Sequence, residues 1–427
     1  MKKYILLFSI FLKIILVAQE IPKKGYDYPY EDPYVATIVG SSTLMMKGVS
    51  DKIPVENYVL DNYTQKKLPE SLWYQKGFKY SLVKQKEKAP LIFIIAGTGA
   101  TYNSKRMTYF QRILYDAGYN VISITSPVNM NFILNASTEG LPSLLKNDSE
   151  DIYKVMTEAY SQVKDKIQVS DFYIMGYSLG AAQAAYVSYI DEQEKKFQFK
   201  RVYMMNPPVD MYKSGVKLDK LLDENIGNDK KNIEKLLDEV FEEISKQTRG
   251  ANIELSETTI YSLFTNKILS EEKMKSLIGL AFRISSVDLN YVTDLISGAG
   301  NYVKAPVGKY ESIFKYFENI NFANFQDYLE KIALPHYMKK GVGKEEILEG
   351  VKINIIEDYL RNSKKIAVVT NADDLILDKE DLNYLKSVFG ERIIIFPKGG
   401  HSGNMYYGPN VKTMLDYLEN GVLNYEN

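Results

Sequence analysis

The chain has 427 residues, no cysteine and two histidines, and its 53 Lys and Arg residues nearly balance 54 Asp and Glu residues, leaving a net charge of −1. The lack of cysteine excludes disulfides, a thiolate nucleophile and Cys-ligated metal centres, and two histidines are too few for a metal site of three imidazoles. The near-zero charge argues against nucleic acid as the main partner, because phosphate binding needs a basic excess.

The N-terminus has the pattern of a secretory signal peptide. Met1-Lys2-Lys3 precedes a mostly apolar run from Tyr4 to Ala18, and polar sequence starts at Gln19. We therefore expect residues 1–18 to be a leader and the protein to be exported, to the periplasm or the extracellular space. An uncleaved N-terminal anchor is the alternative, although the run is short for a membrane span and contains Lys13. No later stretch approaches span length without charges, so we expect no stable membrane span in the mature chain.

Short apolar runs separated by helical patterning begin near residue 78. Runs that predict buried strands lie at 91–95, 120–125, 172–175, 202–205, 366–370 and 393–396. Helical patterning occupies 104–117, 149–167 and 179–189. This alternation predicts an α/β protein with a mostly parallel, doubly wound sheet. Segments 34–40 and 78–84 are predicted to add strands at an antiparallel start of that sheet.

A long helical block interrupts this alternation. Apolar residues such as Leu236, Leu237 and Val240 recur at three- and four-residue spacing, which is typical of an amphipathic helix. Helices are expected at 218–245, 260–280, 287–296, 313–332 and 345–360. We therefore predict three parts after the leader: an N-terminal extension with the first strands (19–77), a core in two pieces (78–210 and 363–427), and a helical cap inserted between those pieces (211–362).

The strongest local motif is Gly176-Tyr177-Ser178-Leu179-Gly180. An apolar strand runs directly into it, and a helix start rich in small residues follows. A strand, a tight turn and a helix in this order form a nucleophile elbow, in which the glycines Gly176 and Gly180 allow close packing and the Ser178 hydroxyl is exposed. A serine in a tight turn without chemistry is the alternative.

A second glycine-rich turn, Ala96-Gly97-Thr98-Gly99-Ala100, follows an earlier buried strand. Its backbone could supply an oxyanion donor at Thr98, paired with the N–H of Leu179 just after the serine. A phosphate-binding loop is disfavoured, because no Gly-Lys-Ser/Thr follows and no third glycine stands at dinucleotide spacing. A turn that merely needs glycine remains the alternative.

The two histidines differ in setting. His401 lies in a Gly-Gly-His loop just past the last apolar strand, where a general base can approach a serine at the edge of the sheet. His336 lies in the cap segment among apolar and aromatic neighbours, which favours a packed or surface imidazole over a substrate contact. An acid is needed to orient the base, and Asp373 and Asp374 directly follow the 366–370 strand. We prefer Asp374, with Asp373 as the alternative.

The chain order Ser178, Asp374, His401 on loops that end strands resembles the α/β-hydrolase fold superfamily. The resemblance covers residues 78–210 and 363–427, with the cap where that family commonly inserts a lid. It implies Ser178 as nucleophile, Asp374 as acid and His401 as base. The oxyanion loop departs from the pattern of many esterases and lipases, because Ala96 stands where they carry His before Gly.

The resemblance implies a serine hydrolase that cleaves a carboxylic ester or related acyl bond through an acyl-enzyme, with no metal or organic cofactor. The cap favours a small-molecule or acyl-chain substrate. A serine peptidase acting on short peptides is the closest alternative, an acyltransferase is compatible, and a non-catalytic secreted binding protein on the same fold is the alternative from another class. The oligomeric state stays open.

Overall fold

The computed structural model describes residues 18–22, 24–42, 45–46, 48–61, 67–227, 231–247, 264, 269–304, 306–320 and 323–425. The predicted leader, apart from Ala18, lies outside these residues.

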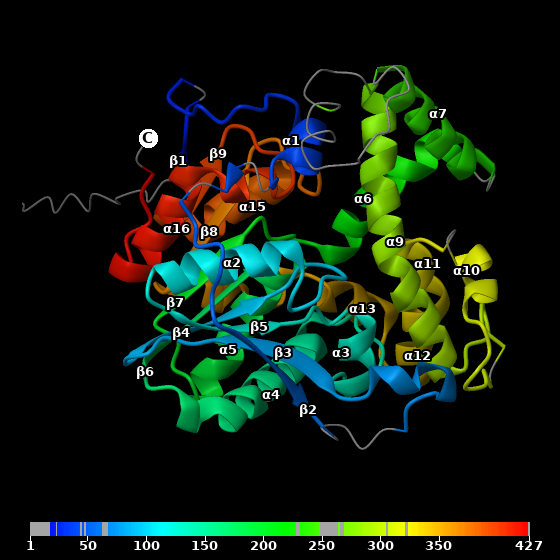
Figure 1. Ribbon diagram of the computed structural model, residues 1–427, viewed down its shortest axis with the longest axis horizontal. Helices are drawn as coiled ribbons and strands as arrows, with labels where there is room; N and C mark the ends of the chain where they lie inside the picture. Colours follow the sequence, from blue (N-terminus) through cyan, green and yellow to red (C-terminus); the bar gives the residue numbers. More distant parts are fainter. Residues whose placement is uncertain are drawn as a thin grey trace, which may run out of the picture.

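A nine-stranded sheet organises the molecule (Figure 1). Its strands are β1 (Gln19–Glu20), β2 (Val55–Leu60), β3 (Phe78–Val83), β4 (Ala89–Ile95), β5 (Asn120–Ile124), β6 (Val169–Tyr177), β7 (Arg201–Met205), β8 (Ile366–Asn371) and β9 (Ile393–Phe396). Their order is β1-β9-β8-β7-β6-β4-β5-β3-β2. Only the β2–β3 and β3–β5 pairs are antiparallel. The chain leaves β4 toward β5 on one side and later returns to place β6 on the other, so β4 and β6 border the switch point at which ligands bind in open α/β sheets.

Both faces of the sheet are covered by helices, because successive strand residues point to opposite sides. Leu91, Phe93 and Ile95 pack with α4 (Leu145–Val163), α5 (Leu179–Glu194) and α15 (Lys379–Phe389). Ile92 and Ile94 pack instead with α2 (Lys105–Asp116) and α16 (Gly408–Asn420). In Figure 1, α2 lies above the sheet while α4 and α5 lie below it. The continuous apolar runs of the sequence are therefore strands buried on both faces, as predicted.

The described elements between β7 and β8 are helices, and α6 and α9 stand side by side next to the sheet (Figure 1). They are α6 (Met211–Ile226), α7 (Lys231–Gln247), α9 (Glu271–Ser297), α10 (Phe314–Ile320), α11 (Phe325–Tyr328), the π-helix η4 (Leu329–Ala333), α12 (Leu334–Lys339), α13 (Lys344–Gly350), the 3-10 helix η5 (Ile353–Ile356) and α14 (Glu357–Asn362). The two helices expected at 260–280 and 287–296 are joined in α9, which runs without a break from Glu271 to Ser297.

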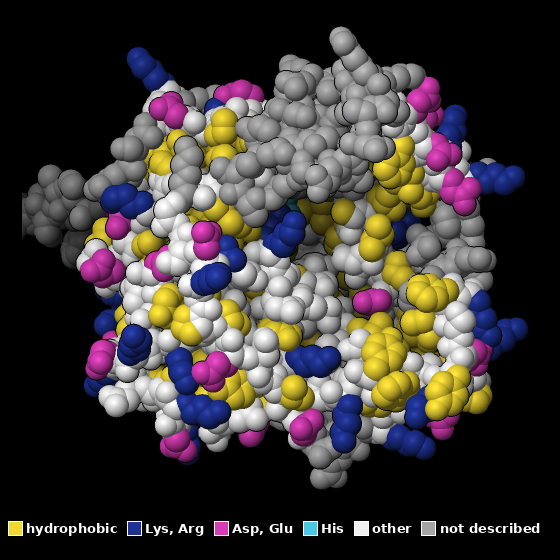
Figure 2. All heavy atoms as spheres, viewed as in Figure 1, with side chains coloured by type: hydrophobic (Ala, Val, Ile, Leu, Met, Phe, Trp, Pro, Cys, Tyr) yellow, Lys and Arg dark blue, Asp and Glu magenta, His cyan; other side chains and the backbone are white. Residues whose placement is uncertain are grey.

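The cap is tied to the core by polar contacts as well as by packing. The Ser214 hydroxyl of α6 donates to the carbonyl oxygen of Ile376 at 3.1 Å. Lys213, also on α6, pairs with Asp378 and Asp381 at the start of α15. Figure 2 shows positive and negative side chains interspersed over the visible face, with hydrophobic side chains gathered toward its right-hand edge over α9, α10 and α12.

The prediction of a strand at 34–40 is wrong, because this segment forms helix α1 (Pro33–Val39). The Asp32 carboxylate accepts the backbone N–H groups of Tyr34 at 2.8 Å and Val35 at 3.0 Å, and Pro33 occupies the first turn. Both features start helices, since proline needs no hydrogen-bond partner there and the aspartate satisfies two free donors. The apolar pattern alone suggested a strand and missed this cap.

Three shorter elements were not anticipated. Strand β2 has a largely exposed edge and no apolar run, so it lacks the signal of a buried strand. Strand β1 contributes only two residues, Gln19 and Glu20, which pair in parallel with β9. Helix α3 (Met130–Asn135) is a short helix capped by Asn129.

Candidate active site

Ser178 occupies a sharp turn between β6 and α5, with φ 53° and ψ −127°. Side chains rarely adopt this region, which glycine favours. The backbone N–H of Ser178 donates to the Met205 carbonyl at 2.8 Å and holds the turn against β7. A Cβ on Gly176 would lie 2.1 Å from the carbonyl oxygen of Gly180, and one on Gly180 would lie 2.3 Å from that of Ile95. The turn therefore requires both glycines, which is the elbow geometry expected of the motif.

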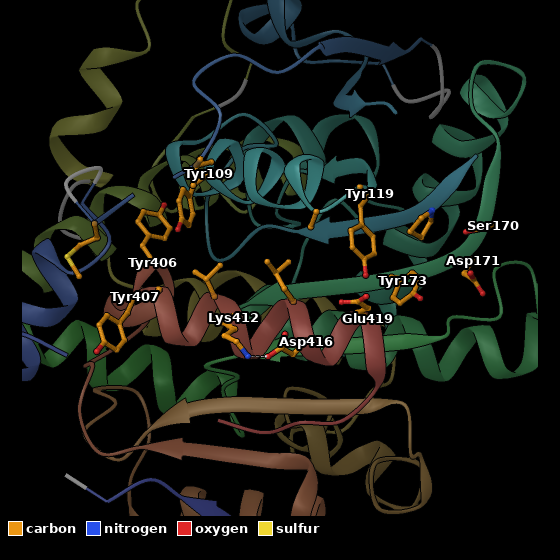
Figure 3. Close-up of a pocket in the computed structure, with 18 residues that line it drawn as sticks. Tyr109, Tyr119, Ser170, Asp171, Tyr173, Tyr406, Tyr407, Lys412, Asp416 and Glu419 are labelled. Carbon is orange, nitrogen blue, oxygen red and sulfur yellow. Dashed lines mark hydrogen bonds and ion pairs between the residues drawn. The ribbon is translucent and has the colours of Figure 1, made fainter. Parts of the chain in front are cut away.

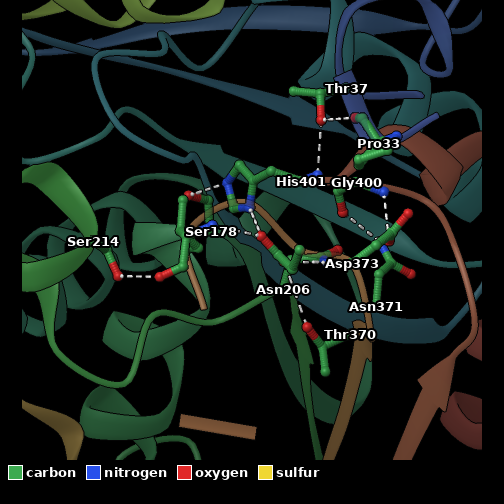
Figure 4. Close-up of polar contacts among 12 residues, drawn as sticks. Pro33, Thr37, Ser178, Asn206, Ser214, Thr370, Asn371, Asp373, Gly400 and His401 are labelled. Carbon is green, nitrogen blue, oxygen red and sulfur yellow. Dashed lines mark hydrogen bonds and ion pairs between the residues drawn. The ribbon is translucent and has the colours of Figure 1, made fainter. Parts of the chain in front are cut away.

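Ser178, His401 and Asp374 form one hydrogen-bonded chain, and Figure 4 shows the imidazole of His401 beside Ser178. The Nε2 atom of His401 lies 3.0 Å from the Ser178 Oγ atom. Its Nδ1 atom lies 2.9 Å from Asp374 Oδ1. The Asp374 side chain has no exposed surface, and 12% of the His401 side chain is exposed. The three predicted residues thus stand in the arrangement of nucleophile, base and orienting acid.

Asp374 is held by donors that sequence reasoning missed. The Asn206 amide, at the end of β7, donates to Asp374 Oδ2 at 2.8 Å. The backbone N–H of Ile376 donates to Oδ1 at 3.1 Å. Oδ1 therefore faces the imidazole while the amide fixes Oδ2. The only sequence signal for Asn206 was its place directly after a predicted strand, in Asn206-Pro207-Pro208.

Asp373, the alternative acid, binds the backbone of the histidine loop. Its two oxygens accept the N–H of Gly400 at 2.9 Å and that of Gly399 at 3.2 Å. Burial raises the pKa of this carboxyl above its ordinary value, and the two backbone donors oppose that rise. Among the described residues, the carboxylate that hydrogen-bonds the His401 ring is Asp374 and not Asp373. Asp373 therefore positions the loop, and Asp374 contacts the base.

Helix α1 also reaches this loop. The backbone N–H of His401 donates to the Thr37 hydroxyl at 2.9 Å, and that hydroxyl donates to the carbonyl of Pro33 at 2.6 Å (Figure 4). Because segment 34–40 was predicted to be a strand, no role for Thr37 could be anticipated. The capping sequence Asp32-Pro33 was the signal that could have placed it.

Thr98 and Leu179, the predicted oxyanion donors, both line the cavity that contains Ser178. Leu179 is the first residue of α5, where backbone N–H groups have no partner within the helix and the helix dipole favours negative charge. Thr98 follows β4, which pairs with β6, so its turn lies beside the elbow. This placement fits an oxyanion site formed by the two turns.

This cavity is narrow, about 60 Å³. Its walls come from the core turns and from three cap helices, α6, α9 and α11. The apolar side chains along it are those of Val128, Pro142, Leu179, Pro208, Met211, Leu218, Phe282, Leu289, Phe325 and Ile376. The three cap helices therefore form part of the wall around Ser178.

A larger cavity of about 870 Å³ lies elsewhere, along α16 (Figure 3). Among the described residues that line it are five tyrosines and the charged side chains of Lys412, Asp416 and Glu419, and no member of the Ser178, His401 and Asp374 chain is among them. Chemistry, not size, therefore identifies the smaller cavity as the candidate active site.

His336 lies on α12, where its Nε2 atom is 3.3 Å from a carboxylate oxygen of Glu139 and its ring meets Tyr337 edge-on. Lys340 contacts the same carboxylate. Of the two histidines, only His401 approaches Ser178.

Across the ranges that the structure describes, no group of three or more His, Asp and Glu side chains is arranged to hold a metal ion. Within the same ranges, no helix has both the length and the apolar character needed to cross a bilayer.

Neither a protein-family model nor a curated protein sequence matches the chain. Solved structures that match include an acylaminoacyl peptidase from Pyrococcus horikoshii (13% identity, TM-score 0.41, 88% of this chain and 43% of that one). Others are an esterase from Pyrobaculum calidifontis (14%, TM-score 0.39, 90% of each chain) and esterase B from Lactobacillus rhamnosis (11%, TM-score 0.39, 86% of each). The chain spans less than half the length of the acylaminoacyl peptidases it matches. The strand order, with the serine, acid and histidine after β6, β8 and β9, gives the chain the predicted α/β-hydrolase fold.

Proposed function

We propose that this protein is an exported serine hydrolase that cleaves carboxylic esters through an acyl-enzyme. The observation that carries the proposal is the hydrogen-bonded chain from Ser178 through His401 to the buried Asp374. An inert turn needs neither the unusual backbone of Ser178 nor an imidazole 3.0 Å from its hydroxyl. Hydrolysis also fits the cavity, which is apolar along most of its length beside the nucleophile.

In the first half of the reaction, His401 Nε2 accepts the Ser178 proton while Oγ attacks the carbonyl carbon. The backbone donors at Leu179 and Thr98 receive the developing oxyanion, each contributing about 3 kcal/mol. Collapse of the tetrahedral intermediate breaks the bond to the leaving group, which takes the proton from His401.

In the second half, water attacks the acyl-enzyme and gives its proton to His401. The acid departs and Ser178 Oγ recovers the proton. Asp374 keeps Nδ1 of the imidazole protonated throughout and stabilises the imidazolium in both halves.

The proposal is tested with a fluorophosphonate probe applied to protein lacking residues 1–18. Wild-type protein should be labelled, and labelling should be lost in Ser178→Ala and His401→Ala. The matched control is His336→Ala, which removes the other imidazole and should leave labelling and ester turnover intact. Absence of labelling in folded wild-type protein would favour a binding protein on the same fold.

Esters and amides are separated by a chain-length series of p-nitrophenyl esters assayed beside aminoacyl naphthylamides. Faster turnover of the amides would show that the protein is a peptidase and not an esterase. Export is tested by expressing the full chain in a bacterium and measuring the mass of the protein in each compartment. Loss of residues 1–18 from protein outside the cytoplasm is expected, whereas a full-length, membrane-bound chain would support the anchor.

A further inference from the structure

One carboxyl group shares the cavity with Ser178 and takes no part in the reaction described above. Asp148 lies in the first turn of α4, only 7% of its surface is exposed, and it lines the same cavity as the nucleophile. It is the one acidic residue among the described residues of that lining, which are otherwise apolar or carry hydroxyl groups, glycine aside.

The neighbouring Asp151, one helical turn away, is a buried carboxylate of the same helix that has several hydrogen-bond donors. Asp151 accepts the backbone N–H of Thr138 at 2.6 Å and its hydroxyl at 2.5 Å, and it pairs with Lys154 at 3.3 Å. That carboxylate is compensated by three donors, one of them a cation.

Asp148 lacks such compensation. The backbone N–H of Ser143 donates to it, and no basic side chain of the described chain forms an ion pair with it. Two tyrosine hydroxyls lie near, but Tyr328 donates to the Pro142 carbonyl at 2.5 Å and Tyr337 to the Leu141 carbonyl at 3.1 Å. Burial, and then the charge of Asp151, raise the pKa of the Asp148 carboxyl well above its ordinary value.

A buried carboxyl without a cation is costly in its ionised form, and a positively charged ligand group removes most of that cost. Most side chains that line the cavity are apolar, and an ion pair is stronger in such surroundings than in water. The side chains of Leu218, Phe282 and Leu289 along the same cavity suit the hydrocarbon part of a ligand.

We propose that Asp148 is a specificity-determining residue that binds a positively charged amine of the substrate, so that the preferred substrates are amine-bearing esters. This inference rests on the proposed serine hydrolase activity and adds a substrate class to it. The amine replaces the missing cation beside Asp148 while the ester carbonyl lies at Ser178.

A purely structural role is the competing explanation, since an acidic residue in the first turn stabilises a helix by its charge. The two explanations differ in what they change. A structural carboxyl affects the stability of the fold, whereas a substrate-binding carboxyl affects the choice between charged and neutral substrates.

The experiment uses pairs of esters of nearly equal shape that differ in charge. They are glycine ethyl ester with ethyl propionate, ethyl 6-aminohexanoate with ethyl heptanoate, and butyrylcholine with 3,3-dimethylbutyl butyrate. The ratio of kcat/KM between charged and neutral members is measured at pH 7 for the wild type and for Asp148→Asn, whose amide still accepts the Ser143 N–H. We expect the wild type to favour the charged member of at least one pair by about tenfold or more, and the variant to lose that preference.

Asp191→Asn is the matched control, because this buried carboxylate of α5 accepts the backbone N–H groups of Phe197 and Phe199 and does not line the cavity, so its loss should lower the melting temperature without altering the ratio. If Asp148→Asn does not fold, Asp148→Ser provides the same measurement. A wild type that prefers the neutral member of every pair, or a ratio that Asp148→Asn leaves unchanged, overturns the inference. Labelling of Ser178 by the fluorophosphonate probe in the same samples separates that outcome from failure of the hydrolase itself.

Discussion

At the scale of single residues, Ser178 shows how the fold holds a reactive group in an unfavourable conformation. Its positive φ places Oγ at the end of β6, in the lining of the cavity and within hydrogen-bond distance of His401. Such strain costs on the order of 1–3 kcal/mol and persists only where the surroundings enforce it. Here they are the hydrogen bond to Met205 and the close packing of Gly176 and Gly180.

The two adjacent acids should differ sharply in their effect on turnover. Asp374→Asn leaves the shape of the site but favours the wrong imidazole tautomer, so we expect kcat to fall by about 10³- to 10⁴-fold. Asp373→Asn removes charge from a group that binds only the loop backbone, so the loss should stay within about tenfold. Steady-state kinetics on a p-nitrophenyl ester measure both, and equal losses would mean that both carboxylates support the base.

The raised pKa of Asp148 predicts that the stability of the fold depends on pH, whether or not a ligand binds. Because its pKa is raised in the folded protein, the folded state holds the proton more tightly than the unfolded chain. Stability therefore falls as pH rises from about 4, the unfolded pKa, toward the folded pKa, by up to about 1.4 kcal/mol per pH unit. Asp148→Asn removes this slope.

Thermal unfolding without substrate, at pH 4 and pH 7, tests this. The melting temperature of Asp148→Asn relative to wild type should be higher at pH 7 than at pH 4. A difference that is constant over this range would show that Asp148 has an ordinary pKa.

At the scale of elements, α1 acts as a support for the histidine loop. The loop approaches the helix so closely that a Cβ on Gly400 would lie 2.2 Å from the Pro33 carbonyl oxygen. The helix therefore presents the Thr37 hydroxyl directly to the His401 N–H.

Thr37→Val should slow catalysis as well as weaken the fold. It keeps the shape of the side chain but leaves the His401 N–H without its acceptor, at a cost of about 1–3 kcal/mol. We expect kcat to fall about threefold to tenfold with little change in KM. The control is Thr413→Val in α16, which loses the same kind of hydroxyl-to-carbonyl bond within a helix and does not touch the loop. Equal kcat values in the two variants would limit α1 to a role in stability.

The elements also show where sequence patterns suffice and where they do not. Strands β4, β6 and β8 are buried on both faces over most of their length, so their apolar runs mark them within three residues of their true ends. Strand β2 is recognised only by its pairing with β3, which no local pattern encodes. Helix α1 was predicted as a strand because its few apolar residues fit a strand as well as a helix. The Asp32 cap, which marks the start of a helix, was not taken into account.

At the scale of the whole molecule, the site joins turns that are far apart in the chain. Ser178, Asp374 and His401 could be chosen from the sequence because each follows a predicted strand, and parallel strands end at one edge of the sheet. Asn206 and Thr37 could not be chosen, because their roles depend on the distance between side chains on different elements. Helical periodicity predicted that helices would lie between β7 and β8, but it could not predict how α6, α9 and α11 wall the cavity.

The cap contains a charged cluster around the buried Arg283, and this cluster joins three of its helices. Arg283 of α9, 2% exposed, contacts Asp223 of α6 at 2.6 Å and lies 3.7 Å from Asp219 of the same helix. Asp219 in turn accepts the backbone N–H of Phe325, at the start of α11, at 2.9 Å. Burial raises the pKa of Asp219 to about 7, and the positive charge of Arg283 opposes that rise.

Removing Arg283 should loosen the cap and leave the core intact. Arg283→Met leaves the buried Asp219 and the partly exposed Asp223 without their cation, which should cost about 1–3 kcal/mol because solvent at Asp223 screens part of the loss. Since the two carboxylates that Arg283 contacts lie on α6, hydrogen exchange measured by mass spectrometry should accelerate in α6, α9 and α11 while β4 and β6 stay protected. Adding Asp219→Leu to Arg283→Met should restore part of the protection, because one uncompensated acid is then gone. Lys331→Met, which removes an exposed partner of Asp327, should change exchange little. Faster exchange in the sheet as well as in the cap would instead mean that the two parts unfold together. The cap helices that wall the cavity could then not open unless the sheet that holds Ser178 also unfolded.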